Sequence, residues 1–197
     1  MKKIVLTGGP CGGKTSVRRL LKQAFREQVT VVKEMATTLL KGGFPVPPPD
    51  HPEFEKWQVL FEQAIFPAQI ALEDANEMLA LPNIQLIVYD RGLLDVDAYA
   101  PGCSAGLLHR HDLTRSSILT RYDTVIHLVS LAVSDPVAYG QIGNKHRFET
   151  VERATELEHR CLDAWQDHPK RHVINGADDI QAKVDQVFAL VRQLLAE

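Results

Sequence analysis

A glycine-dense loop near the N-terminus constrains the fold of this chain more than any other feature. Residues Gly8 to Thr15 read Gly-Gly-Pro-Cys-Gly-Gly-Lys-Thr and fit the pattern G-x-x-x-x-G-K-[ST]. The apolar run Ile4–Leu6 precedes the loop, and apolar residues at helical spacing follow it from Val17 to Ala24. The sequence therefore predicts a strand, a tight loop and a helix in direct succession, which is the context that this pattern requires.

Such a loop binds phosphate for simple physical reasons. Glycines adopt backbone conformations that a Cβ would forbid, so successive N–H groups can turn inward around a polyphosphate. The helix that follows adds unpaired N–H groups and the positive end of its dipole. We predict that Lys14 reaches the β- and γ-phosphates of ATP and that the Thr15 hydroxyl ligates Mg²⁺. The predicted nucleotide-binding residues are Gly8, Gly9, Pro10, Cys11, Gly12, Gly13, Lys14, Thr15, Ser16 and, after the last predicted strand, Asn175.

Composition narrows the class of protein and its partners. A length of 197 residues suits one domain, and 45% hydrophobic residues are enough for a core. The net charge of −3, without a basic block, argues against nucleic acid or an anionic membrane as the main partner. Three widely spaced cysteines make neither a disulfide framework nor a zinc pattern. With no signal peptide and no apolar run of membrane-spanning length, we expect a cytoplasmic protein.

Strands alternate with helices along the rest of the chain. Beyond the strand at 4–6, strands are expected at 30–34, 84–90, 123–129 and 171–175. Helices are expected at 17–25, 35–40, 53–81, 93–99, in pieces within 107–122, at 148–165 and after an Asp178 cap, with loops at 101–106 and 131–146. This alternation predicts an α/β layer fold with a parallel sheet, whose ligands bind at the carboxyl ends of the strands.

Residues 44–81 are the predicted substrate side of the site. Five prolines at 44–52 exclude regular structure and favour a rigid surface loop near the site over a domain linker. Pro67 is expected to kink the long helix that follows or to split it in two. One face of this helix is expected to pack in the core, and stacking of a substrate base on Trp57 or Phe61 is the alternative. The residues of this face are Phe54, Trp57, Phe61, Ile65, Ile70, Ala71, Asp74 and Met78.

With these residues in place, the chain resembles the P-loop kinases. It is most similar to the small ATP-binding proteins of the AAA-domain type that are related to bacterial nicotinamide riboside kinases, and Asp90-Arg91 resembles the Asp-Arg pair of thymidylate kinases. The similarity covers nearly the whole chain, with further matches at Glu34-Met35-Ala36, Gly42-Gly43, Asp90 to Asp95, Tyr122-Asp123, Asn144 to Thr150, Ala164-Trp165 and His168-Pro169. It implies a single domain over residues 1–197 with a three-layer P-loop NTPase fold and a five-stranded parallel sheet in the order 2-3-1-4-5. It also implies a helical substrate-side region at about 44–81 and a lid region at about 131–150.

The sequence offers a residue for each part of phosphoryl transfer. Thr15 and Asp90 are predicted to hold Mg²⁺, since this ion usually takes one or two carboxylates together with phosphates. Glu34 is the predicted general base, because related kinases carry a carboxylate after the second strand. The alternative role for Glu34 is a carboxylate that the helix dipole favours at a helix start. Arg91 is predicted to hold a substrate phosphate or ribose.

The predicted lid carries basic residues. Arg147, in the sequence Asn144-Lys145-His146-Arg147, is predicted to act on the β- and γ-phosphates as an arginine finger does, with Arg153 as a second candidate. A solvated basic helix start is the alternative. Asn175 is predicted to contact adenine, or else to form a simple turn with Gly176. His127 lies in an apolar strand and is expected to be a hydrogen-bonded core histidine.

Together these features predict a Mg²⁺-dependent kinase with Lys14, Glu34, Asp90, Arg91 and Arg147 as catalytic residues. It would transfer the γ-phosphoryl group of ATP to a hydroxyl or phosphate of a nucleoside, nucleotide or related small molecule. The alternative is a nucleotide-binding regulatory ATPase or switch without a small-molecule acceptor. A kinase consumes ATP only when an acceptor is present, whereas a switch hydrolyses ATP slowly alone or responds to a protein partner. The sequence predicts neither the acceptor nor the oligomeric state.

Overall fold

Five parallel strands form one sheet in the order β2-β3-β1-β4-β5. The computed structural model describes residues 1–141, 149–175 and 179–197. The strands are β1 (Lys2–Thr7), β2 (Val29–Val32), β3 (Leu86–Asp90), β4 (Thr124–Leu128) and β5 (Arg171–Ile174). Every residue of β3 and β4 is buried, as expected for strands that helices cover on both faces. The predicted strand order and the α/β class are confirmed.

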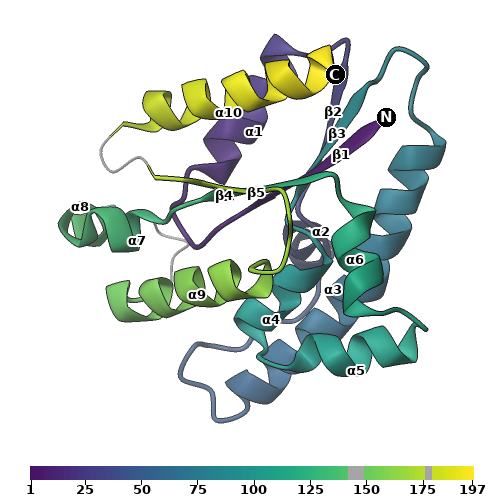
Figure 1. The fold of residues 1–197 in the computed structure, drawn as a ribbon. Coiled ribbons are helices and arrows are strands. Elements are labelled where there is room, and N and C mark those ends of the chain that lie inside the picture. The colour runs from purple at the N-terminus through teal and green to yellow at the C-terminus, as the bar shows by residue number, and fades with distance from the viewer. Residues whose placement is uncertain (142–148, 176–178) are drawn as a thin grey trace.

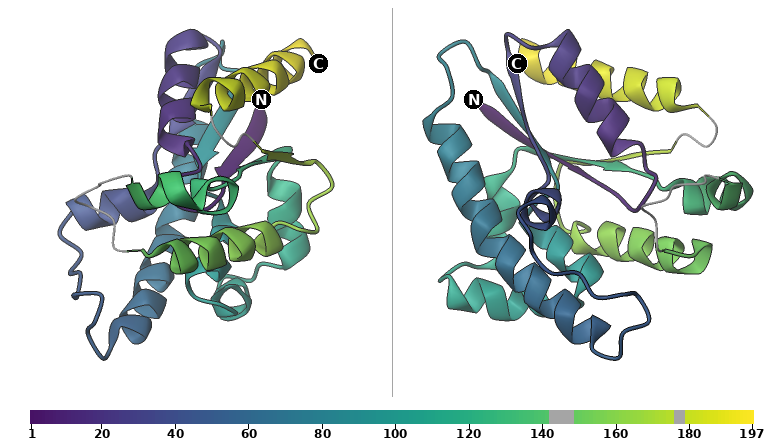
Figure 2. Two further views of the ribbon diagram at one scale, coloured as in Figure 1. Left: turned by 90° about the vertical axis from the view of Figure 1, so that its left-hand side faces the viewer. Right: turned by 180° about the vertical axis from the view of Figure 1, so that it is seen from behind.

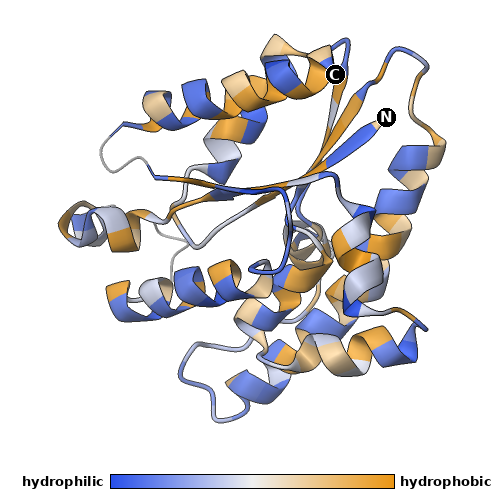
Figure 3. Ribbon diagram, in the orientation of Figure 1, coloured by the Kyte–Doolittle hydropathy of each residue, from blue (hydrophilic) through white to orange (hydrophobic). Residues whose placement is uncertain are grey.

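Helices cover both faces of the sheet and complete three layers (Figure 1, Figure 2). Ile4 and Leu6 of β1 face α1 (Lys14–Ala24) and α10 (Ile180–Ala196). Val5 faces the other side, which α3 (Phe54–Met78), α4 (Val96–Tyr99), α5 (Cys103–Arg110), α6 (Arg115–Arg121) and α9 (Val151–Ala164) cover. Figure 3 shows hydrophobic and hydrophilic segments alternating along α9 and α10, which is typical of helices with one buried side.

The two ends of the chain lie side by side at the amino end of the central strand (Figure 1, Figure 2). The Nζ of Lys2 lies 2.9 Å from a carboxylate oxygen of Glu197 and donates a hydrogen bond of 2.8 Å to the carbonyl oxygen of Leu194. The carboxyl ends of the strands therefore point away from both termini. Of the helices in the described parts of the chain, none has the length and apolar character needed to span a bilayer.

The boundaries of several helices differ from the sequence predictions, and four short helices within the described residues complete the fold. They are α2 (Met35–Lys41), the 3-10 helix η1 (Leu93–Asp95), α7 (Leu131–Ser134) and α8 (Pro136–Gln141). The loop expected at 101–106 ends at Gly102, where α5 begins. The described part of 131–146 contains two short helices, although an irregular segment was predicted. Pro136 is compatible with α8 because it occupies the first position of that helix, where no N–H is needed. Asp179 caps α10, and the predicted cap, Asp178, lies outside the described residues.

Helix α3 runs as one helix through Pro67, so of the two predicted outcomes, a kink or a split, the split is wrong. Phe66, only 1% exposed, anchors this part of the helix in the core, and such packing overrides the local preference of proline. The predicted buried face is correct at Phe61 and at Ile70, which packs against the core, but wrong at the end of the helix, where Asp74 is exposed and Met78 is 78% exposed. Apolar periodicity could not identify Gln69 and Glu73, which are buried in this half of the helix although both are polar.

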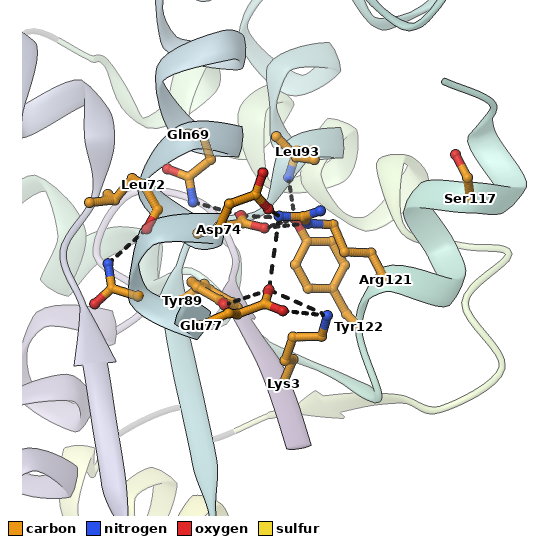
Figure 4. Close-up of polar contacts among 12 residues, drawn as sticks. Lys3, Gln69, Leu72, Asp74, Glu77, Tyr89, Leu93, Ser117, Arg121 and Tyr122 are labelled. Atoms are coloured by element: carbon orange, nitrogen blue, oxygen red, sulfur yellow. Dashed lines mark hydrogen bonds and ion pairs between the residues drawn. The ribbon is translucent and has the colours of Figure 1, made fainter. Parts of the chain in front are cut away.

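A polar network attaches the second half of α3 to the rest of the fold (Figure 4). The buried carboxylate of Glu73 accepts hydrogen bonds from Gln69 Nε2 at 2.8 Å, Arg121 Nε at 2.7 Å and the Tyr122 hydroxyl at 2.9 Å. The Tyr122 oxygen in turn accepts the backbone N–H of Leu93 at 3.2 Å. The network thus joins α3 and the end of α6 to η1, the segment directly after Asp90-Arg91-Gly92.

The substitution Tyr122→Phe tests this network. It leaves the N–H of Leu93 unpaired and removes one donor from Glu73, both of which are buried. We expect the free energy of unfolding to fall by about 1–3 kcal/mol, the cost of a buried unsatisfied group. Urea denaturation measures the change. The control Tyr89→Phe loses one bond, to the partly exposed Glu77, and should cost less; equal losses would contradict the role of Tyr122.

Candidate functional site

The glycine-dense loop connects β1 to α1 and lies against the end of β4. A Cβ on Gly8 would collide with the carbonyl oxygen of Leu128, and a Cβ on Gly12 would lie 2.5 Å from the same oxygen. Gly8 and Gly13 have φ angles of 127° and 91°, which side chains disfavour. Close approach and backbone conformation therefore both require glycine here. The loop is a built structure rather than a merely flexible one.

Lys14 lies across the inside of this loop. Its Nζ donates hydrogen bonds to the carbonyl oxygens of Gly8 and Gly9 at 2.6 and 2.7 Å. Burial, together with the positive charge of Arg91, lowers the pKa of Lys14 to about 8. Helix α1 begins with Gly13 as its N-cap, has no side-chain cap and has no acidic residue in its first turn. An anion in the loop would thus lie near the uncapped N–H groups at the start of α1, and its negative charge would stabilise the charged form of Lys14.

Apart from Arg147, which lies outside the described residues, the predicted catalytic residues gather at the carboxyl edge of the sheet next to Lys14. Glu34 is the N-cap of α2 and is separated from the end of β2 by Lys33, and Asp90 is the last residue of β3. A carboxylate oxygen of Glu34 lies 3.5 Å from Arg91 Nε, and Asp90 accepts a hydrogen bond from Arg18 on α1. Lys14 interacts electrostatically with Arg91, Asp90 and Glu34. Three elements distant in sequence therefore converge on one charged cluster.

The pKa values of the two carboxyl groups of the cluster are shifted in opposite directions from their ordinary values. Burial alone would raise the pKa of Glu34, but Arg91 and the Thr37 hydroxyl, which donates at 2.6 Å, hold it below its usual value. Burial and the nearby charge of Glu34 raise the pKa of Asp90, against the opposing effect of Lys14 and Arg18. Arg91 and Thr37 thus favour the ionised form of Glu34, whereas burial and the charge of Glu34 disfavour the ionised form of Asp90.

Arg91 is held in a backbone conformation that few arginines adopt. Its φ angle is 79°, in the left-handed region, which costs of order 1–3 kcal/mol and persists only where neighbours enforce it. Its N–H donates to the carbonyl oxygen of Leu6 at 3.1 Å, and Gln69 Nε2 donates to its carbonyl oxygen at 3.4 Å. The guanidinium lies 3.3 Å from Asp95 and hydrogen-bonds to the Tyr99 hydroxyl. Contacts to the main chain and to the guanidinium of Arg91 therefore both fix the direction of its side chain.

Two buried charged residues support the loop from behind. Glu158 on α9 accepts the N–H of Gly9 at 2.6 Å, and its other oxygen lies 2.7 Å from His127 Nε2. Lys183 on α10 lies 3.4 Å from the carbonyl oxygen of Gly12 and also donates to the end of β4. His127 is buried in the core as predicted and its Nε2 is bonded, but its buried Nδ1 has no partner among the described residues. Helices α9 and α10 are thus bonded directly to the phosphate-binding loop.

The residues predicted to hold Mg²⁺ have suitable chemistry. In residues 1–141, 149–175 and 179–197, no group of three or more His, Cys, Asp or Glu side chains is arranged to hold a metal alone. Thr15, at the start of α1, and Asp90 offer one hydroxyl and one carboxylate. This hard-oxygen pair fits an ion that takes its remaining ligands from phosphates and water. Arg18 is the present partner of Asp90.

The other predicted site residues are less tightly connected. Asn175 is exposed directly after β5, and Arg153 on α9 pairs with Glu156 at 2.5 Å. Arg147 and the sequence 144–147 lie outside the described residues. Sequence reasoning missed Arg18, although its place four residues after Lys14 puts both on one face of α1. It also missed the supporting role of Glu158, which no local pattern signals.

A cavity of about 1330 Å³ opens beside Glu34 and Arg91. Helices α2 and α3 and the proline-rich loop form much of its wall. Trp57 and Phe61 stack in this wall with ring centroids 5.1 Å apart and an angle of 15° between the rings. The aromatic face of α3 therefore lines a cavity as well as the core. Stacking of a substrate base on Trp57 or Phe61, the alternative to a purely core role, requires such a cavity.

Comparisons with known proteins agree with this geometry. A family model described as "AAA domain" matches residues 3–183. The chain belongs to this AAA-domain family. The structure of deoxyadenosine kinase from M. mycoides with bound dATP is similar, with a TM-score of 0.50 and 14% identity, over 96% of this chain and 99% of that one. At this identity the likeness shows the P-loop kinase-like fold. No curated protein sequence matches the chain.

The substitution Gly12→Ala tests how closely the loop approaches β4 in this AAA-domain protein. The added Cβ would press on a backbone carbonyl that cannot move aside. We expect the free energy of unfolding to fall by about 1–3 kcal/mol. The control is Gly106→Ala in α5, where a Cβ meets nothing within 4 Å and helix propensity predicts a gain of up to about 1 kcal/mol. Similar effects of the two substitutions in chemical denaturation would contradict the close approach.

Proposed function

We propose that this protein is an ATP-dependent kinase that phosphorylates a small molecule bound in the cavity beside Glu34 and Arg91. The observation that carries the proposal is the position of the charged cluster. Lys14, Glu34, Asp90 and Arg91 lie between a phosphate-binding loop and a cavity large enough for an acceptor. Phosphoryl transfer depends mainly on positioning and on neutralising charge, and this arrangement provides both.

The donor side is formed by the loop and the start of α1. Their N–H groups bind the polyphosphate of ATP, and Lys14 exchanges the carbonyl oxygens of Gly8 and Gly9 for phosphate oxygens. Thr15 and Asp90 hold Mg²⁺, which when bound neutralises phosphate charge. We also propose that Asn175 contacts adenine and that Arg147, or Arg153 in its place, acts on the phosphates from the lid region at about 131–150. The bound dATP of the similar deoxyadenosine kinase supports a nucleotide ligand.

The acceptor side is formed by Glu34 and Arg91 together with the region at about 44–81. The ionised Glu34 accepts the proton of the attacking hydroxyl. Arg91, whose guanidinium is held in place by Asp95 and Tyr99, orients the acceptor and balances the charge of Glu34. The acceptor is a nucleoside, a nucleotide or a related small molecule. We further propose a cytoplasmic location, and no nucleic-acid partner, because the net charge is −3.

A regulatory ATPase or switch would use the same loop but would have no need of a cavity beside the base. Acceptor dependence of ATP consumption separates the two functions. We expect ATP consumption by the purified protein to rise when one of a set of nucleosides, nucleotides and nicotinamide riboside is added. Hydrolysis at one low rate in all mixtures would favour the switch.

The role of Lys14 predicts a pH dependence of ATP binding. Its pKa of about 8 in the free protein must rise when phosphates lie beside it, so binding takes up a proton above pH 8. ATP affinity should therefore fall as the pH rises from 8, by up to about tenfold per pH unit. Calorimetry in two buffers of different ionisation enthalpy measures the proton uptake. Lys14→Ala should weaken binding, remove this uptake and abolish turnover, whereas Lys22→Ala, exposed on the same helix, should preserve all three.

The substitution Glu34→Gln tests the proposed base. It keeps the size of the side chain but removes its ability to take a proton. We expect ATP affinity to stay within about twofold and the rate of transfer to fall by roughly 10²–10⁴, the usual contribution of a general base. Single-turnover kinetics measure the rate, with the exposed Glu27→Gln as control. Transfer at the full rate would leave Glu34 with the alternative role of a helix-start carboxylate.

A further inference from the structure

The cavity beside Glu34 is larger than a site for a small metabolite needs to be. Its volume of about 1330 Å³ exceeds the roughly 300–1,000 Å³ of pockets that enclose drug-sized ligands. None of the described residues that line it comes from the phosphate-binding loop. This space is thus additional to the space that the phosphates of ATP would occupy.

The cavity extends along α3 away from the charged cluster. Gln69, which bonds to the backbone of Arg91, lines one end, and Trp57 lies twelve residues earlier on the same helix. At a rise of 1.5 Å per residue, twelve residues span about 18 Å of helix axis. An acceptor with its reacting group at Glu34 would therefore leave a long stretch of the cavity to be filled by the rest of the molecule.

Much of the wall of this stretch is apolar, and this apolar part is already formed. Its residues include Leu40, Val46, Pro47, Trp57, Phe61 and Ile65. Trp57 donates a hydrogen bond of 2.6 Å from Nε1 to the carbonyl oxygen of Pro45, which ties the proline-rich loop to α3. Its ring stacks on Phe61, and Phe44 packs on both rings. Such a surface binds apolar or aromatic groups with little cost of ordering.

The charges around the cavity disfavour an anionic acceptor. The described lining residues include six carboxyl side chains and two arginines: Glu34, Asp50, Glu55, Glu62, Asp95, Glu149, Arg91 and Arg153. Both arginines already have partners, since Arg91 pairs with Glu34 and Asp95, and Arg153 pairs with Glu156. Burial raises the pKa of Glu62 to about 8, so at neutral pH this group is a hydrogen-bond donor rather than a charge. A phosphate entering here would meet an excess of negative charge.

We propose that the acceptor is an alcohol without negative charge that carries an apolar or aromatic body longer than a nucleoside. This inference rests on the proposed kinase function and narrows its substrate class. The hydroxyl oxygen forms a bond to the γ-phosphorus, the bond from that phosphorus to the β–γ bridging oxygen breaks, and its electron pair leaves with ADP. The hydroxyl proton passes to Glu34 and then to solvent. The products are a phosphate monoester and ADP.

Trp57 provides a direct readout of binding in the cavity. The chain has two tryptophans, and Trp165 is fully buried in the core, so a change in emission on ligand addition reports Trp57. The probes are 4-phenyl-1-butanol, 6-phenyl-1-hexanol and 6-phenylhexyl phosphate, titrated with a non-hydrolysable MgATP analogue bound. Two added methylenes should tighten binding about tenfold. The phosphate should bind at least tenfold more weakly than its parent alcohol, and Trp57→Phe should remove the signal.

A matched pair of variants tests the apolar wall. Val46 lines the cavity and is 55% exposed, whereas Val59 is 39% exposed on α3 and lies outside the lining. Val46→Asp should weaken binding of 6-phenyl-1-hexanol at least fivefold, and Val59→Asp should leave it unchanged. Because both positions are exposed, both variants should fold. Equal affinities in the two variants would overturn the proposed wall.

Turnover separates this inference from the kinase function on which it rests. We expect ATP consumption with 6-phenyl-1-hexanol to exceed that with 4-phenyl-1-butanol, and adenosine monophosphate to give none. If the MgATP analogue fails to bind, the kinase function is overturned. If the analogue binds but adenosine monophosphate is the better acceptor, or chain length has no effect on affinity, the inferred acceptor class is overturned and the kinase function stands.

Discussion

The close contact between the phosphate-binding loop and the end of β4 determines most of what this protein can do. Gly8 and Gly12 approach the carbonyl oxygen of Leu128 so closely that no side chain fits between them. Glu158 accepts a hydrogen bond from one backbone N–H of the loop, and Lys183 donates one to a backbone carbonyl oxygen of the loop. With these groups bonded, the loop is held beside Lys14, and it leads into a helix whose first N–H groups have no side-chain cap. Preorganised donors of this kind need little rearrangement when an anion binds.

The charged cluster depends on a second constraint, the strained backbone at Arg91. A left-handed arginine is unfavourable alone, and the hydrogen bonds of Leu6 and Gln69 to its main chain help to hold it. Gln69 also belongs to the Glu73 network, so the polar face of α3 reaches from the core to the site. Glu73 thus holds the Gln69 amide that donates to the main chain of Arg91, a contact that an apolar face of α3 could not make.

The sequence predicted the parts of the fold that follow from local pattern, and it failed where packing decides. The loop, the five strands and the end-of-strand positions of Glu34 and Asp90 follow from glycine spacing and apolar runs. The buried face of α3 could not be predicted, because Glu73 looks like a surface residue until Arg121 and Tyr122 are placed beside it. Glu158 was missed for the same reason, since its partners come from the loop and from β4.

Adjacent residues of α9 touch both halves of the site. Leu157 lines the acceptor cavity, and Glu158 holds the N–H of Gly9 in the loop. The same helix therefore borders both the cavity and the loop, so a displacement of α9 at the cavity also moves the residue that holds the loop. If filling the cavity steadies α9, it also steadies the loop, and thermodynamic linkage then requires the nucleotide to strengthen acceptor binding by the same factor. If the proposed kinase function is correct, the protein would thereby favour the complex with both ligands over the complex with either one alone, and less ATP would be hydrolysed by water.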